Sequence, residues 1–420
     1  MELKLGHKRT EVGVIPVDWH VTPLASVADK IMVGIASAAT HAYRSKGIPM
    51  FRNQNIKPGR LDDDDLLFIA PEYEAAYRNK RLRAGDLLTM RTGYPGVTAL
   101  VPEEYEQAQS FTTLITRPNK SSIEPLYLCY YINSELGKKF FIQSQIGGAQ
   151  KNVNAGTLRG MPLGLPSTLI EQTAIATALC DVDALLSGLD KLIAKKRDLK
   201  QAAMQQLLTG KTRLPGFDGE WVTQKLRDVA TLKARIGWQG LTTSEYLDTG
   251  DYYLVTGTDF ANGRIAWEDC HYVTQSRYNQ DQYIQIRLRD VLVTKDGTIG
   301  KVALVDELDR PATLNSGVFV IRPKKDGFEP EFFYFLLMSR IFDEFLSQLS
   351  AGSTINHLYQ KDFVGFTYAL PPTKEEQIAI AKVLSDMDTE LTALETRREK
   401  TRLLKQAMMQ ELLTGKTRLV

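Results

Sequence analysis

A Gly-Lys-Thr sequence occurs twice in this chain, at 210–212 and 415–417, where it could indicate a loop that binds phosphate. Such a loop needs a preceding strand and a glycine five positions before the Gly of Gly-Lys-Thr. Gln205 and Gln410 stand at those two positions, and each Gly-Lys-Thr follows a helical pattern. We therefore interpret both as helix ends, where glycine stops the helix and basic residues face its carbonyl groups.

Other residues that could support catalysis or bind a metal lack the required spacing. The histidines form no HExxH or paired metal-ligand pattern, and no Gly-x-Ser-x-Gly or dinucleotide-binding motif is present. The acidic run 62–65 could suggest a metal site, but consecutive side chains point in different directions, so a solvated loop is the simpler interpretation. The sequence gives no grounds for an active site or a metal site. The histidines are His7, His20, His41, His271 and His357.

The composition is that of a folded protein without a membrane segment. The chain has 420 residues, 43% hydrophobic and 24% charged, with a net charge of +2, which allows two or three domains with full cores. Cys129, Cys180 and Cys270 are far apart and odd in number, so we expect a reducing, cytoplasmic environment. The N-terminus is polar and no apolar run could span a bilayer, so we expect no membrane partner.

The chain contains a tandem duplication. Residues 171–214 and 376–419 align without a gap, 205 positions apart, with 26 of 44 residues identical. Shorter matches extend through the preceding segments, including Arg117-Pro118 with Arg322-Pro323. A repeat of about 200 residues indicates two related domains rather than a short-period solenoid. We call the segments 1–168 and 215–373 the first head and the second head.

Each head has the pattern of an α+β domain with a mostly antiparallel sheet. Three short β-prone runs follow one another, separated by turns that contain glycine. Pro125 and Pro330 then stand where a helix would start, and the apolar spacing after each proline predicts a helix with one apolar face. The predicted strands span 87–90, 97–101 and 112–116 in the first head, and 291–294, 301–305 and 318–321 in the second.

Two long helices are predicted, within 169–214 and 374–420. Their apolar residues repeat at spacings of four and three, as in a coiled-coil seam. The spacing then breaks and resumes at Leu199 and Leu207, or at Leu404 and Met408, which we interpret as a stutter. Because a head lies between the helices in sequence, an antiparallel coiled coil with pseudo-two-fold symmetry is the simplest closure. The seam residues are Ile175, Leu179, Val182, Leu186, Leu189, Ile193, Ile380, Leu384, Met387, Leu391 and Leu394.

The long helices also carry an excess of positive charge. Residues 188–213 include seven basic and two acidic residues, and residues 393–418 include seven and three. Such a cluster can be an electrostatic footprint for nucleic acid or a solvated helix face, and both interpretations stay open.

The duplicated motifs together resemble the specificity subunits of type I DNA restriction–modification systems. In each half, the markers are a Leu-Pro pair, a Glu-Gln pair followed by isoleucine, and a closing Leu-Leu-Thr-Gly-Lys-Thr-Arg-Leu. The set occurs twice, in order, and the likeness covers essentially the whole chain, which makes it more specific than any single motif. The markers are Leu165-Pro166, Glu171-Gln172, Ile175 and 207–214, then Leu370-Pro371, Glu376-Gln377, Ile380 and 412–419.

The resemblance implies that the heads are target-recognition domains, each of which binds one half of a bipartite sequence in double-stranded DNA. It implies that the helices are spacers that dock two methylation subunits, which carry S-adenosylmethionine and methylate adenine at N6. A restriction subunit that uses ATP and Mg can join them. The chain itself would have no active site and would bind no cofactor or metal. Because residues 30–83 and 233–287 barely resemble each other, we expect an asymmetric target.

Three loop regions in each head are candidates for DNA contact: a polar loop, a hairpin tip, and a loop after the head's helix. The polar loop of the first head has side chains that suit bidentate hydrogen bonds to guanine or adenine. The corresponding loop of the second head has smaller side chains, which could accept a hydrogen bond from cytosine. The alternatives are turn hydrogen bonds, backbone geometry and solvation. The candidates are Arg52, Asn53, Gln54, Asn55, Arg91, Thr92, Tyr94, Gln150, Lys151 and Asn152, then Thr256, Thr258, Asp259, Lys295, Thr298, Thr354, Asn356 and His357.

A second hypothesis from another class remains. The chain could be a coiled-coil scaffold whose two heads bind proteins instead of DNA. Binding through phosphates weakens steeply with added salt, so the salt dependence of binding separates the two hypotheses.

Overall fold

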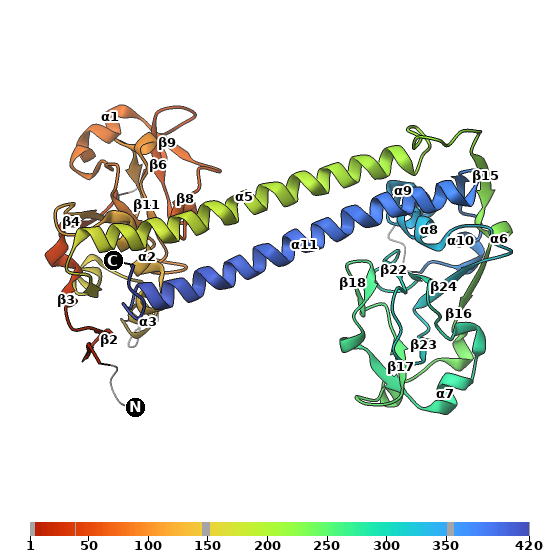
Figure 1. Ribbon diagram of the computed structural model, residues 1–420. Helices are drawn as coiled ribbons and strands as arrows, with labels where there is room; N and C mark the ends of the chain where they lie inside the picture. The colour runs from red at the N-terminus through yellow and green to blue at the C-terminus, as the bar shows by residue number, and fades with distance from the viewer. Residues whose placement is uncertain (1–4, 38, 145–151, 351–356, 420) are drawn as a thin grey trace. The chain divides into compact units, whose positions relative to one another are not determined.

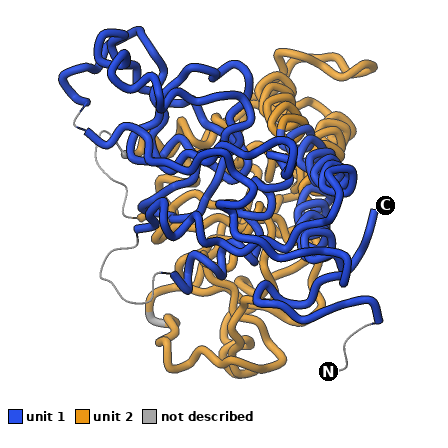
Figure 2. The backbone as a smooth tube through the Cα atoms, turned by 90° about the vertical axis from the view of Figure 1, so that its left-hand side faces the viewer, with its two compact units in different colours: residues 1–190, 396–420 blue, residues 191–395 orange. Residues whose placement is uncertain are grey.

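The structure, a computed structural model, describes residues 5–37, 39–144, 152–350 and 357–419. None of the helices in these ranges is long and apolar enough to cross a membrane. The chain divides into two units: residues 1–190 with 396–420, and residues 191–395 (Figure 2). Each unit contains one head and part of both long helices, α5 (Leu169–Leu207) and α11 (Lys374–Leu412) (Figure 1).

The first head is built on an antiparallel sheet in the order β11-β10-β13-β4. Both faces are buried: Leu87 and Leu114 face the core that includes the head's helix, and Leu88 and Ile115 face a second apolar cluster. A second sheet, β12-β6-β9-β5, adds one parallel pair, β12 with β6. The strands are β4 (Ala28–Val33), β5 (Tyr43–Arg44), β6 (Ile48–Phe51), β9 (Leu67–Ile69), β10 (Leu87–Thr89), β11 (Thr98–Leu100), β12 (Gln109–Ser110) and β13 (Leu114–Pro118).

The second head repeats the main sheet in the order β16-β24-β21-β22. Its faces alternate in the same way, with Val291 and Phe319 in one apolar cluster and Leu292 and Val320 in another. The smaller sheet is β20-β17-β23, in which β17 and β23 are parallel. The strands are β16 (Ala230–Ala234), β17 (Tyr252–Val255), β20 (His271–Val273), β21 (Val291–Thr294), β22 (Val302–Leu304), β23 (Ala312–Leu314) and β24 (Val318–Pro323).

The helix predicted after each proline is divided in two. In the first head, α2 (Pro125–Asn133) ends at Ser134, whose backbone is extended, and α3 (Glu135–Ser144) follows. The Ser134 hydroxyl donates to Tyr131 O and accepts from Leu136 N, which stabilises the break. The second head has the same arrangement in α8 (Pro330–Leu337) and α9 (Arg340–Ser350). The expectation of one apolar face was wrong for α2 and α8, which are buried on nearly all sides.

A short two-stranded sheet leads from each head to its long helix. In the first head β3 (His20–Pro23) pairs with β14 (Pro162–Leu165), and in the second β15 (Val222–Lys225) pairs with β25 (Thr367–Leu370). Short helices α4 (Ala155–Arg159) and α10 (Gln360–Phe363) precede β14 and β25.

The long helices pair antiparallel in each unit, because residues further along α5 contact residues nearer the start of α11. In the first unit, Asp183 pairs with Lys405 and Asp190 with Arg398. In the second unit, Lys196 pairs with Glu390, and further contacts follow the same direction. Both helices end before a glycine with a positive φ, Gly210 or Gly415, as predicted.

The predicted seam residues are all buried or partly buried. At the start of α5, Ile175 and Leu179 pack in the core of the first head. At the start of α11, Ile380 and Leu384 pack in the core of the second head. The predicted stutter was wrong at Leu199 and Leu404, which are 46% and 55% exposed. The seam residues that are fully buried are Ile175, Leu179, Leu189, Ile193, Ile380, Leu384 and Leu391, and those partly buried are Val182, Leu186, Met387 and Leu394.

The Glu-Gln pair at the start of each long helix connects three parts of a unit. Glu376 is fully buried and receives Arg213, which follows the end of α5, at 2.5 Å. Gln377 accepts a hydrogen bond from Glu329 N, at 2.8 Å, just before α8.

The first unit repeats this arrangement with the duplicated residues. Arg418 pairs with Glu171, and Glu124 N donates to Gln172. The Leu-Thr-Gly-Lys-Thr-Arg-Leu segment after one long helix therefore supplies the arginine that pairs with the start of the other, which explains why both motifs occur twice.

Candidate nucleic-acid interface

One edge of the main sheet in each head gathers loops that are far apart in the sequence. In the first head, Val33 at the end of β4 and Thr89 at the end of β10 both lie opposite Leu114, where β13 begins. The second head has the same register, with Ala234 and Val293 both opposite Phe319, and β21 continues by one residue to Thr294, opposite Val318. We call the residues beyond these strand ends the strand-end edge: 34–37, 90–97 and 110–113 in the first head, and 235–240, 295–300 and 315–317 in the second.

In the first head, hydrogen bonds hold the three candidate loops together at this edge. Asn53 Nδ2 donates to Thr92 Oγ1 at 2.9 Å, and Arg91 N donates to Asn53 Oδ1 at 3.3 Å. Val153, in the loop after α3, donates its N–H to Arg91 O at 3.0 Å, and Arg91 Nε donates to Val153 O. Tyr94, at the hairpin tip, is 77% exposed. The arrangement presents an exposed aromatic ring and polar groups on a fixed base.

The first polar loop divides into exposed and structural side chains. Arg52 and Gln54 both donate to Asp65 Oδ2 at 3.0 Å, and the Arg52 guanidinium lowers the pKa of the Asp65 carboxyl. Asn55 is buried, and its side chain donates to the carbonyl groups of Asp62 and Asp64. Asn55 thus makes the loop's own turn bonds, and its amide is not open to a base in this conformation.

In the second head, the hairpin tip again meets the loop that follows the head's helices. Leu358 N donates to Lys295 O at 2.8 Å, the counterpart of the Val153–Arg91 bond. His357 Nδ1 hydrogen bonds to Asp296 Oδ1, which orients the ring, and the imidazole packs on Tyr359 with ring centroids 4.5 Å apart. Lys295 N donates to Gly317 O at 2.9 Å, so residues 315–317 join this edge.

The first candidate region of the second head is bonded internally. Thr256 N donates to the buried Asp259 carboxylate at 2.7 Å, and the hydroxyls of Thr256 and Thr258 are 2.6 Å apart. Gly257 lies against Thr294, since a Cβ there would be 2.8 Å from Thr294 Cγ2. The turn is therefore next to the hairpin, but the Asp259 side chain is used by the turn.

The remaining candidates differ in whether the structure describes them. Asn152 is exposed beside Val153, and Thr298 is exposed at the tip of its hairpin. Gln150, Lys151, Thr354 and Asn356 lie outside the described residues.

Sequence analysis missed two parts of the edge. Asn315 and Ser316 precede β24 in a polar turn, where Asn315 Nδ2 donates to Tyr246 at 2.6 Å. The Asn-Ser-Gly sequence before a β-prone run was the available signal. In the first head, Ser110 Oγ and Thr113 Oγ1 occupy the corresponding place, buried and without a hydrogen bond among the described residues. No sequence pattern marks these hydroxyls.

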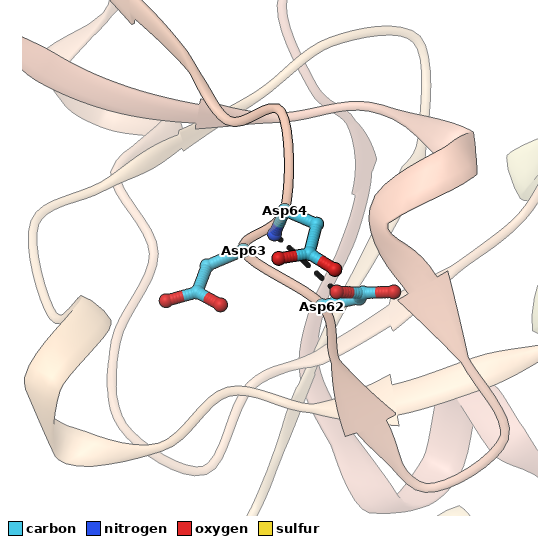
Figure 3. Close-up of side chains that lie close together, drawn as sticks. All are labelled: Asp62, Asp63 and Asp64. Carbon is cyan, nitrogen blue, oxygen red and sulfur yellow. Dashed lines mark hydrogen bonds between the residues drawn. The ribbon is translucent and has the colours of Figure 1, made fainter. Parts of the chain in front are cut away.

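The acidic run in the first head forms a loop, as the sequence indicated. Figure 3 shows Asp62 beside Asp64, whose N–H donates to Asp62 Oδ1 at 3.3 Å, while the Asp63 side chain points elsewhere. The three carboxylates each offer an oxygen within 4.8 Å of the others. Asp63 accepts from Tyr105 at 2.8 Å, and burial, followed by this bond, raises the pKa of Tyr105 to about 12. Asp63 and Asp64 are exposed, and the half-buried Asp62 pairs with Lys57 at 3.6 Å.

Known proteins show the same two-part plan. A family model described as the type I restriction modification DNA specificity domain matches residues 16–196 and 218–405. A putative type I restriction enzyme MjaX specificity subunit from Methanocaldococcus jannaschii is 26% identical, over 98% of this chain and 96% of its own length. The EcoBI specificity subunit of Escherichia coli is 23% identical over 47% of this chain and 42% of its own.

Solved structures share the fold. The type I restriction–modification S subunit from M. genitalium has a TM-score of 0.60 at 14% identity, over 98% of each chain. A chain from a type I R-M system, described for its complex assembly and conformational transition, has a TM-score of 0.58 at 18% identity, over 96% of this chain and 99% of its own. Because the family model covers most of both halves, the chain belongs to the family of type I restriction–modification specificity subunits.

Proposed function

We propose that this chain selects the DNA sequence for a type I complex by placing the strand-end edge of each head against one half of a bipartite target. The observation that carries the proposal is the repeated assembly of that edge. In both heads, loops distant in sequence converge there, and the same backbone bond joins them, Val153 N to Arg91 O and Leu358 N to Lys295 O. Side chains on a fixed backbone suit base recognition, because base edges are distinguished by the position of donors and acceptors.

The different side chains of the two edges support an asymmetric target. The first head presents Thr92 and Tyr94 beside the half-buried Arg91, and the second presents Thr298 and an Asp296-bound His357. The Lys295 side chain is 15% exposed, with its amine 5.6 Å from the Phe319 ring centroid. Donor and acceptor patterns that differ this much suit different bases. Asn55 and Asp259 are left out of the proposed recognition set, because they are buried and bonded within their own loops.

The outer face of α5 supports a further part of the proposal, the docking of methylation subunits. Leu185, Leu192 and Leu199 recur every seven residues and are 43%, 39% and 46% exposed. Gly188 lies on the same face, with open space where a Cβ would stand. Exposed leucines at this interval suit an apolar helix of a partner. We propose that two such partners carry S-adenosylmethionine and methylate adenine N6, and that a restriction subunit, when present, supplies the ATP- and Mg-dependent activity.

Co-expression with the methylation subunit tests the proposal directly. Single-molecule sequencing of the host DNA should then show modified adenine in a motif of two unlike halves separated by unspecified bases. Modification in a contiguous motif, or no modification beyond the host's own, would contradict the proposal. As a control, the methylation subunit expressed alone should leave the DNA unmodified.

Salt dependence separates this function from a scaffold with protein-binding heads. Affinity of the assembled complex for duplex DNA should fall steeply with rising salt, with a slope that grows with the number of phosphate contacts. An affinity for DNA that is negligible at low salt would favour the scaffold.

A further inference from the structure

Arg235 is a buried cation in the second head without a carboxylate partner. The residue directly follows β16 and is only 2% exposed. Arg235 Nε donates to Leu314 O at 2.8 Å, and the other guanidinium nitrogens donate to Thr313 Oγ1 and Gln280 Oε1, both at 3.2 Å, and to Gln239 O. All of these acceptors are neutral. They fix the position of the positive charge but do not neutralise it.

Most other buried charges in the described part of the chain have an oppositely charged partner. Glu74 pairs with Arg81, Asp86 with Arg117, and Asp290 with Arg322. The buried Glu171, Glu329 and Glu376 likewise have arginine partners. Arg235 and Asp259 are the exceptions among the described residues. Because an unpaired buried charge is costly, a cation kept in this state calls for a counter-charge that arrives from outside.

The charge lies beneath the strand-end edge. Thr313 and Leu314, which accept from the guanidinium, lead directly into residues 315–317, and Gly317 O accepts from Lys295 N. Arg277 repels the Arg235 charge and is itself paired with Glu245, while the carboxylates of Asp281 and Glu245 attract that charge without forming an ion pair with Arg235. Burial lowers the pKa of Arg235, but an arginine stays protonated at neutral pH because its ordinary pKa is far higher. In a medium of low dielectric constant, a fixed charge acts strongly on an anion at the adjacent surface.

We propose that Arg235 is a positioning residue whose buried charge attracts a backbone phosphate of duplex DNA to the strand-end edge of the second head. This inference rests on the proposed function, and it adds a sequence-independent phosphate site to one head. At the same place in the register, the first head has Gly34, whose carbonyl accepts from Lys80 at 2.8 Å. At this position a buried arginine therefore occurs only in the second head, whereas the first head has the partly exposed Lys80.

Two variants separate the charge from the packing. Arg235→Gln keeps an N–H donor for the carbonyl groups but removes the charge. Arg235→Lys keeps the positive charge but replaces the planar guanidinium with an ammonium group. In the complex with the methylation subunit, Arg235→Gln should weaken binding to the target duplex about ten-fold and reduce the salt slope by about one. Arg235→Lys should retain affinity within about three-fold. The methylated motif should be unchanged, because phosphates carry no sequence information.

Arg322→Gln provides the structural control. Arg322 is paired with Asp290 at 2.6 Å in the same head, so this substitution should lower thermal stability more than Arg235→Gln does. Wild-type affinity and salt slope in Arg235→Gln, or an equal loss in Arg235→Lys, would overturn the inference and leave the proposed function standing. A wild-type complex that binds no duplex DNA would overturn both.

A second measurement needs no substituted protein. In the wild-type complex, adding target duplex should slow amide hydrogen exchange in residues 235–240 and 315–317. Unchanged exchange in both segments, while the duplex is bound, would overturn the inference even if a variant failed to fold.

Discussion

The first and second heads share one sheet order but differ in the residue that comes directly after the outer strand. Val33 at the end of β4 precedes Gly34, whereas Ala234 at the end of β16 precedes the buried Arg235. The strand-end edge of the first head contains buried hydroxyls, Ser110 Oγ and Thr113 Oγ1, that make no hydrogen bond among the described residues. The corresponding edge of the second head contains a cation held by neutral acceptors.

The attachment of each head to the long helices is, by contrast, nearly the same. Lys405 pairs with Asp183 in the first unit, with its amine 5.4 Å from the Tyr130 ring centroid. Lys200 takes the same place in the second unit, beside Asp388 and 5.5 Å from the Phe335 ring centroid. The duplicated residues are therefore those that position the heads, and the unlike residues gather at the edge. This division suits the proposed function, in which two heads attached in the same way recognise different half-sites.

The largest expected effect tests whether the two attachments are equivalent. Glu376→Ala leaves Arg213 with only backbone acceptors, so we expect the unfolding free energy of the second unit to fall by about 3 kcal/mol. Glu171→Ala should cost the first unit less, about 2 kcal/mol, because Arg418 keeps Asp18 at 3.0 Å. Chemical denaturation measures both, with Glu375→Ala as the exposed control. Equal losses would show that Asp18 contributes nothing.

A smaller effect is expected on the outer faces of the long helices. Leu192 and Arg397 are equivalent positions 205 residues apart, and both are exposed. Leu192→Glu should weaken association with the methylation subunit about 30-fold, or about 2 kcal/mol, because it places a charge in an apolar contact. Arg397→Glu should change association less. Titration calorimetry checks this, and a greater loss in Arg397→Glu would place the apolar contact elsewhere.

Substitutions at the two hairpin tips should each affect one half of the proposed DNA target. Tyr94→Ala should reduce affinity about five-fold, near 1 kcal/mol, and relax the sequence preference in one half of the motif. Thr298→Ala, at the equivalent position, should have a smaller effect confined to the other half. Methylation profiling of each variant gives the result. A change in both halves from either substitution would contradict the assignment of one half-site to each head.

The smallest effect concerns acid stability. The bidentate Arg81 pair, and then the Gln109 amide, hold the pKa of Glu74 below its usual value. A lowered pKa in the folded state stabilises the head above the ordinary glutamate pKa of about 4.3, and this stability is lost as pH falls through the lowered pKa. Glu74→Gln should therefore remove about 1 kcal/mol near neutral pH, since the glutamine amide still accepts from Arg81, and flatten the acid dependence of the first unit.

The second head provides the comparison for this measurement. There a backbone N–H, from Thr242, is the main cause of the lowered pKa of Glu245, and Arg277 adds to it. Because the Glu245 side chain is 30% exposed whereas Glu74 is buried, Glu245→Gln should change acid unfolding less than Glu74→Gln does. Thermal unfolding followed between neutral and acid pH measures both, and a steeper acid loss in Glu74→Gln than in the wild type would contradict the expected sign.

Local chemistry made the elements predictable. Pro125 and Pro330 begin α2 and α8, and Gly210 and Gly415 follow the long helices with φ of +68°. Three of the four main-sheet strands in each head lie within two residues of their predicted bounds, because β-branched runs between glycine turns favour extended backbone. The outer strands β4 and β16 were not predicted. The division of each head's helix was not predicted, since it depends on one serine hydroxyl, on Ser134 or Ser339, and on the packing around it.

The sequence by itself determined the duplication, three strands of each main sheet, the ends of the long helices, their antiparallel pairing and the polar loops, because these depend on spacing and local propensity. Only the tertiary structure decided which loop side chains remain open. Asn55 and Asp259 are used within their own turns, Leu199 and Leu404 face outward, and Arg235 is buried without a counter-charge. Burial and pairing depend on segments many residues away, so a polar residue in a loop looks the same in sequence whether it binds DNA or its own backbone.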